Sequence, residues 1–195
     1  MPSPTGNGPA RARYLEMNEF GLDLRLARNR RAVGELANIA VRLPSHRWSM
    51  APAPGKWTPA QHVIHVALAY WAMTSDVRDG RPADLIGSAS QRMVWRIFGL
   101  SQVIWLGRIP PGARAPRELR PTDEPRERGT VLDELRAQLE EFDAVVRHAW
   151  RTKPGHRAAH PYFGALSLRQ AIRVCEVHTR HHAALLHQWP LDNRG

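Results

Sequence analysis

The chain has 195 residues, of which 43% are apolar and 24% are charged, and it contains one cysteine. This composition is typical of a globular domain with a core of its own, and a lone cysteine excludes both an internal disulfide and a multi-cysteine zinc site. The 28 basic residues outnumber the 18 acidic ones by ten. The arginines are scattered and accompany no nucleic-acid-binding motif, so we expect no nucleic-acid partner.

Apolar residues that recur at helical spacing predict four helices, over residues 16–43, 58–78, 130–152 and 167–188. Pro44 follows the first of these helices, and Asp79-Gly80 follows the second. Thr58 and Ser167 are candidate helix caps, and Pro59 suits a first helical turn. No segment shows the alternation that is typical of a β-strand. We therefore expect an all-α four-helix bundle.

A long connection joins the second and third predicted helices. Residues 89–106 are apolar enough to form a helix, which would act as a lid, a homodimer face or a membrane-surface helix; we favour the first two roles. Residues 109–125 contain five prolines and should form an extended strap.

The organisation that we expect is a disordered tail over residues 1–13, a single domain over residues 14–190, and a short tail over residues 191–195. The longest apolar run, residues 97–107, is far shorter than the roughly 20 residues of a membrane-spanning helix. We expect no membrane span and no secretory leader, and hence a cytoplasmic protein.

Histidines supply the first indication of chemistry. His178 and His182 are four residues apart on the inward stripe of the last helix, so their imidazoles share one face. Buried imidazoles need partners, which either a divalent metal ion or core hydrogen bonds would supply. His65 on the second helix is a candidate third ligand, with His62 as its competitor. Cys175, one turn before His178, is either a fourth ligand or a small core residue.

Three segments resemble motifs of the DinB/YfiT-like metal-binding bundles. Residues 57–65 (WTPAQHVIH) resemble the start of their second helix, and residues 178–182 (HTRHH) resemble the motif on their fourth. Residues 160–167 (HPYFGALS) are similar to a segment of one uncharacterised branch of that superfamily. The resemblance implies a DinB-like four-helix bundle that holds a divalent ion, zinc or nickel, on His65, His178 and His182.

The resemblance also bears on the reaction, because such bundles include S-transferases that use low-molecular-weight thiols, and maleylpyruvate isomerases. We expect an enzyme in which a three-histidine metal site activates a thiol or water for transfer to, or hydrolysis of, a small molecule. The alternative is a non-catalytic bundle that binds a metal or another ligand. Tyr162 and His160 are the candidate catalytic residues. Gln61 and Glu176 are candidate hydrogen-bond acceptors for the ligand imidazoles.

Overall fold

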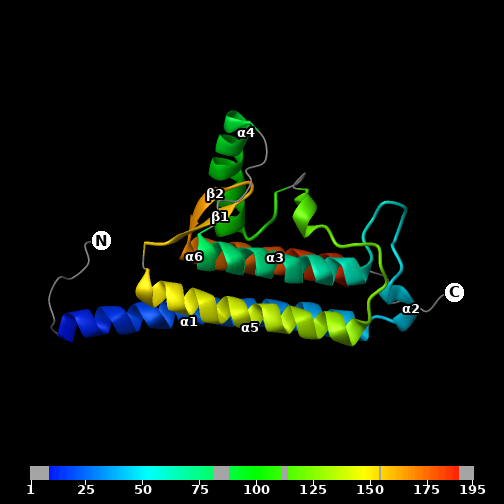
Figure 1. Ribbon diagram of the computed structural model, residues 1–195, viewed down its shortest axis with the longest axis horizontal. Helices are drawn as coiled ribbons and strands as arrows, with labels where there is room; N and C mark the ends of the chain where they lie inside the picture. Colours follow the sequence, from blue (N-terminus) through cyan, green and yellow to red (C-terminus); the bar gives the residue numbers. More distant parts are fainter. Residues whose placement is uncertain (1–8, 81–87, 111–113, 154, 189–195) are drawn as a thin grey trace.

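Four long helices run side by side in the computed structural model, which describes residues 9–80, 88–110, 114–153 and 155–188 (Figure 1). They are α1 (Pro9–Arg42), α3 (Pro59–Asp79), α5 (Arg128–Thr152) and α6 (Leu168–His187). The most extensive contacts join α1 to α6 and α3 to α5, and α3 also packs on α6. The predicted all-α bundle is confirmed.

Two expectations about the elements were wrong. Helix α1 begins at Pro9, so residues 9–13 of the predicted tail are helical, while residues 1–8 and 189–195 lie outside the described part of the chain. A hairpin, β1 (Arg157–His160) and β2 (Gly164–Ser167), precedes α6, although we expected no strand. Four-residue strands are too short to show an alternating pattern, so only the pairing reveals them.

The long connection is helical in its first part, as predicted. It comprises α4 (Ala89–Val94), η1 (Trp95–Gly99) and η2 (Gln102–Leu106), and it stands out from the bundle in Figure 1. Trp105 is 82% exposed and Phe98 is 64% exposed, so these side chains do not cover a site on the bundle. Among the described helices, none has both the length and the apolar character that crossing a bilayer requires.

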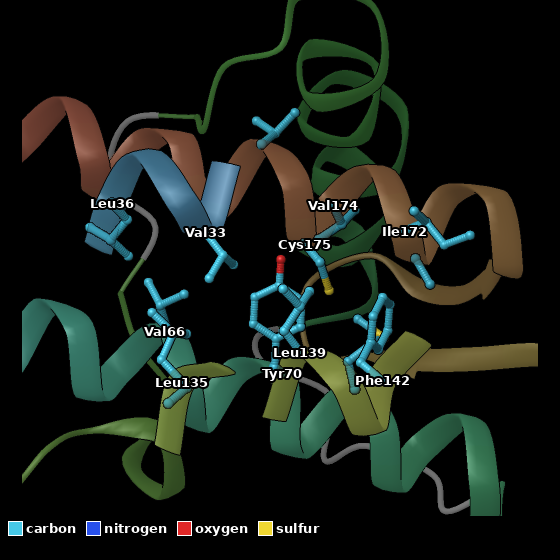
Figure 2. Close-up of a cluster of buried hydrophobic side chains, with 14 of the residues drawn as sticks. Val33, Leu36, Val66, Tyr70, Leu135, Leu139, Phe142, Ile172, Val174 and Cys175 are labelled. Atoms are coloured by element: carbon cyan, nitrogen blue, oxygen red, sulfur yellow. The ribbon is translucent and has the colours of Figure 1, made fainter. Parts of the chain in front are cut away.

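The core lies between the four long helices, which all contribute apolar side chains to it (Figure 2). A buried polar network crosses this core. The Tyr70 hydroxyl donates to Asn29 Oδ1 (2.7 Å) and accepts from Thr179 Oγ1 (3.2 Å), while Asn29 Nδ2 donates to the carbonyl of Ile172 (3.1 Å). These bonds tie α1, α3 and α6 together, because buried polar groups are costly unless they are paired.

Capping boxes determine where α3 and α6 begin. Thr58 caps α3 together with Gln61, and Ser167 caps α6 together with Gln170, in each case with reciprocal side-chain to backbone bonds. Gln61 also donates to the Thr122 carbonyl (3.3 Å) and to Asp123 (2.9 Å) in the strap. The start of α3 and the strap are thus held together, which matters for the histidines one turn further along α3.

Candidate metal centre

Three imidazole nitrogens converge between α3 and α6. His65 Nε2 lies 3.1 Å from His178 Nε2, which in turn lies 3.2 Å from His182 Nε2. The ligand atoms of this group, the histidine cluster, all lie within 4.8 Å of one another. His65 and His182 are buried and His178 is half-buried. The structure therefore brings together the three histidines that the sequence analysis selected, and they could hold a metal ion.

Hydrogen bonds determine which ring nitrogens carry protons. His65 Nδ1 lies 2.7 Å from the Leu119 carbonyl oxygen, which can only accept, so this nitrogen carries the proton. In the neutral ring, His65 Nε2 then presents a lone pair to the cluster. His182 Nδ1 lies 2.9 Å from His62 Nδ1. If His182 is the donor in this pair, its Nε2 also presents a lone pair.

The groups that orient the cluster differ from those we expected. Gln61 is engaged with the cap and the strap, and Glu176 accepts from Arg173 (2.8 Å), so neither is the acceptor that we had predicted for a cluster imidazole. The backbone of Leu119, in the short helix η3 (Arg117–Leu119), takes this role for His65, and the His62 ring lies within hydrogen-bond distance of His182. A backbone carbonyl carries no sequence signal, and only the fold identifies it.

The ring of Trp57 packs against the cluster. The Trp57 ring centroid lies 4.9 Å from that of His65, 5.5 Å from that of His62 and 6.4 Å from that of His182. Trp57 immediately precedes the Thr58 cap, so the residue just before α3 lies against His65, His62 and His182.

Burial keeps these imidazoles neutral. It lowers the pKa of His65, an effect that the hydrogen bond to Leu119 partly opposes. Burial, and then the neighbouring histidines, hold the pKa values of His178 and His182 well below the usual range. The pKa of His62 falls to about 4, first through burial and then through the charges of His65 and His181. Neutral imidazole is the form that binds a metal.

The same pKa shifts predict how stability depends on pH. A histidine whose pKa is lowered by folding binds its proton more readily in the unfolded chain, so its contribution is complete above about pH 6.5 and is lost as the pH falls toward the folded pKa. His62 and His160, both with folded pKa values of about 4, should each remove about 1.4 kcal/mol of stability per pH unit over this range.

Urea unfolding of the metal-free protein between pH 7.5 and 4.5 measures this loss. The free energy of unfolding should fall less steeply with pH in the His160→Asn variant than in the wild type, because asparagine does not titrate. The difference in slope should correspond to about one bound proton. Parallel declines in the two proteins would contradict the assignment to His160.

A cavity of about 570 Å³ opens beside the cluster. All three cluster histidines line it, together with Trp57, Trp95, Leu119, Cys175 and His160. Asp76 lines it as well, three helical turns or about 16 Å beyond His65 along α3, and burial raises its pKa to about 6. No motif had indicated Asp76, because a single acidic residue in a helix is most often surface charge.

The two candidate catalytic residues have different surroundings. The Tyr162 hydroxyl donates to the Arg114 carbonyl (2.6 Å) and accepts from the Arg114 amide (3.1 Å), and its ring packs on Trp95 (5.0 Å between centroids). These contacts fasten the strap to the hairpin. His160 lies at the end of β1, and its ring stacks on Phe163 with centroids 4.4 Å apart and planes at 14°.

Two further residues of α6, Cys175 and His181, lie close to the cluster in the sequence. Cys175 is buried, and burial raises the pKa of its thiol to about 12. It is not part of the metal-compatible group found among the described residues, in keeping with a core residue rather than a fourth ligand. His181 is exposed and presents its ring edge to His182 at 5.4 Å, so it is not in that group either.

The donor set fits a divalent ion. Tetrahedral coordination with metal–nitrogen distances of about 2.0–2.1 Å places neighbouring ligand nitrogens about 3.3 Å apart, close to the observed 3.1 and 3.2 Å. Without a cation, one proton on His178 Nε2 would have to serve both His65 and His182. A shared cation would satisfy all three lone pairs, and imidazole is a ligand for zinc, nickel, copper and iron alike.

A model of the DinB superfamily matches residues 26–186 of the chain. The chain belongs to the DinB superfamily. This match confirms the resemblance noted in the motifs, and it includes the helices α3 and α6 that carry the histidine cluster of this DinB-superfamily chain. No curated protein and no solved structure matched the sequence.

Proposed function

We propose that this DinB-superfamily protein is a metal-dependent enzyme that acts on a small molecule, with His65, His178 and His182 as its metal ligands. The observation that carries the proposal is the convergence of three Nε2 atoms at the wall of an open cavity. Catalytic metal sites characteristically combine three protein ligands with one position left for water or substrate, whereas structural sites are closed by four.

Neighbouring residues of the chain would orient the imidazoles for metal binding. Leu119 and His62 orient His65 and His182 through Nδ1, so that Nε2 of each ring faces the cluster. Trp57 and the strap shield one side of the cluster from water. A divalent ion bound there would supply Lewis acidity, which lowers the pKa of a thiol or a water molecule.

Two reactions suit this arrangement. In thiol transfer, the sulfur of a low-molecular-weight thiolate bonds to an electrophilic carbon, and the leaving group departs with its electron pair. In hydrolysis, the oxygen of water bonds to a carbonyl carbon, and the leaving group departs with a proton. The cavity supports a small-molecule substrate in either case, since its volume lies within the usual range of about 300–1,000 Å³.

Metal analysis and a paired activity assay test the proposal. Purified protein should contain about one divalent ion per chain and should turn over either 1-chloro-2,4-dinitrobenzene with a low-molecular-weight thiol or 4-nitrophenyl acetate with water. Chelation should abolish the turnover, and zinc or nickel should restore it. Protein that binds the ion tightly without turnover on a broad substrate panel would instead be the non-catalytic binding module.

His62 should strengthen metal binding without being a ligand. Replacing His62 with leucine removes the acceptor for His182 Nδ1, and we expect metal affinity to fall by about 10- to 100-fold. His62→Asn should lose less, because its amide oxygen can accept the same proton. Competition with a chromophoric chelator measures both affinities. Complete loss of binding in His62→Leu would contradict the orienting role and make His62 a ligand.

A further inference from the structure

The hairpin loop holds the His160 ring in one tautomer. His160 Nδ1 accepts hydrogen bonds from the backbone amides of Tyr162 (3.2 Å) and Phe163 (3.3 Å). Pro161, between His160 and Tyr162, has no amide proton to offer, and Gly164 completes the loop with φ of +65°, a conformation that favours glycine. A neutral imidazole that accepts at Nδ1 carries its proton on Nε2.

The loop thereby explains the His-Pro-Tyr-Phe-Gly sequence. Histidine supplies the acceptor for the turn, Phe163 is buried and stacks on the imidazole, and glycine takes the positive φ. Arg96 secures the loop from outside, donating to the carbonyls of Phe163 (2.7 Å) and Ala165 (3.1 Å). The His160 ring is therefore fixed in both orientation and protonation before any ligand arrives.

The fixed ring lies in the wall of the cavity that also contains the histidine cluster. His160 and His178 both line this cavity. Much of the remaining wall is apolar, although Asp76, Arg114, Arg117 and Glu118 also line the cavity. The apolar part is formed by Ala69, Ala72, Met73, Trp95, Ile109 and Val174. An N–H donor in an apolar wall favours a ligand with one acceptor atom in the corresponding position.

We propose that the cavity binds a largely apolar small molecule that carries a carbonyl or carboxylate oxygen, and that His160 donates its Nε2–H to that oxygen. This inference rests on the proposed function, since it places the acceptor beside the metal ligands. His160 is then one polar contact that selects among apolar molecules of similar size. Tyr162 is not suited to this role, because its hydroxyl is engaged with the Arg114 backbone.

Benzoate and toluene provide a matched pair of probes, because they share a ring and differ in the acceptor. Binding to wild type and to His160→Asn is measured through the fluorescence of Trp57 and Trp95, which line the cavity, and through ligand-observed NMR. The asparagine oxygen can replace Nδ1 as the acceptor for the loop amides, but the residue lacks a donor at the position of Nε2. We expect benzoate to bind about tenfold or more weakly to the variant, and toluene to bind equally to both proteins.

Equal benzoate affinity in a folded His160→Asn protein would overturn the proposal, as would wild-type protein that binds neither probe. Nitrogen-15 NMR of histidine-labelled wild type is a second test that needs no variant. His160 should show a protonated Nε2 and an unprotonated Nδ1 at neutral pH, and the opposite tautomer would also overturn the proposal.

The two hypotheses can fail separately. Titrations are run with and without one equivalent of zinc. If the wild type binds no metal but His160→Asn still weakens benzoate binding, then the proposed metal-dependent function fails and the ligand class stands. If the wild type binds metal but His160→Asn leaves benzoate binding unchanged, then the proposed ligand class fails and the proposed metal site stands.

Discussion

Replacing any one of His65, His178 and His182 with alanine should reduce metal content from about one ion per chain to near zero. In the proposed site each imidazole would supply one of the three donors found among the described residues, and the remaining two would hold a divalent ion more than about 100-fold more weakly. Inductively coupled plasma mass spectrometry of the purified variants, after dialysis against a weak chelator, measures this loss. Circular dichroism checks that each variant is folded.

His181→Ala is the matched control for this series. His181 is adjacent to His182 on α6 but is exposed and lies outside the cluster, so its variant should retain the metal content of the wild type. Metal retention by all three cluster variants would exclude the proposed ligand set. Equal loss in His181→Ala would show that binding reflects histidine content rather than geometry.

A large effect on stability should come from the core face of α1. Leu26 is completely buried, whereas Leu24, two residues away on the same helix, is 49% exposed. Leu26→Ala removes the same atoms as Leu24→Ala but leaves a cavity between the helices. We expect Leu26→Ala to lower the free energy of unfolding by about 3–5 kcal/mol and Leu24→Ala by less than about 1 kcal/mol.

Urea unfolding of both variants in the presence of a chelator measures this difference without a contribution from metal binding. Any loss beyond that of Leu24→Ala reports on core packing, because the two substitutions change helix propensity identically. Similar losses in the two variants would mean that α1 does not pack against the bundle as described.

The protruding segment from α4 to η2 is helical, as predicted, but its surroundings differ from those that we expected. Its apolar sequence predicted a helix, and the helix is present. The proposed lid does not follow from it, because Trp95 lines the cavity whereas Phe98, Trp105 and Leu106 are exposed. Periodicity reports that one face is apolar, but it does not report which other element that face meets.

Much of this protein follows from local sequence. The 3.6-residue periodicity of apolar side chains predicted the four long helices, and Thr58 and Ser167 marked the starts of α3 and α6 because a cap bonds only to its own first turn. The i, i+4 spacing placed His178 and His182 on one face for the same reason. These are interactions within one helix, so the sequence alone is sufficient to identify them.

The tertiary structure decided what depends on contacts between elements. Sequence left His62 and His65 as competitors, and the packing of α3 on α6 brings His65 Nε2 to the cluster and His62 Nδ1 to the opposite side of His182. The carbonyl of Leu119, the pairing of two four-residue strands and the tautomer of His160 all arise from segments that meet only in the folded chain. Backbone groups are the same at every residue, so no sequence pattern can reveal which of them a histidine will contact.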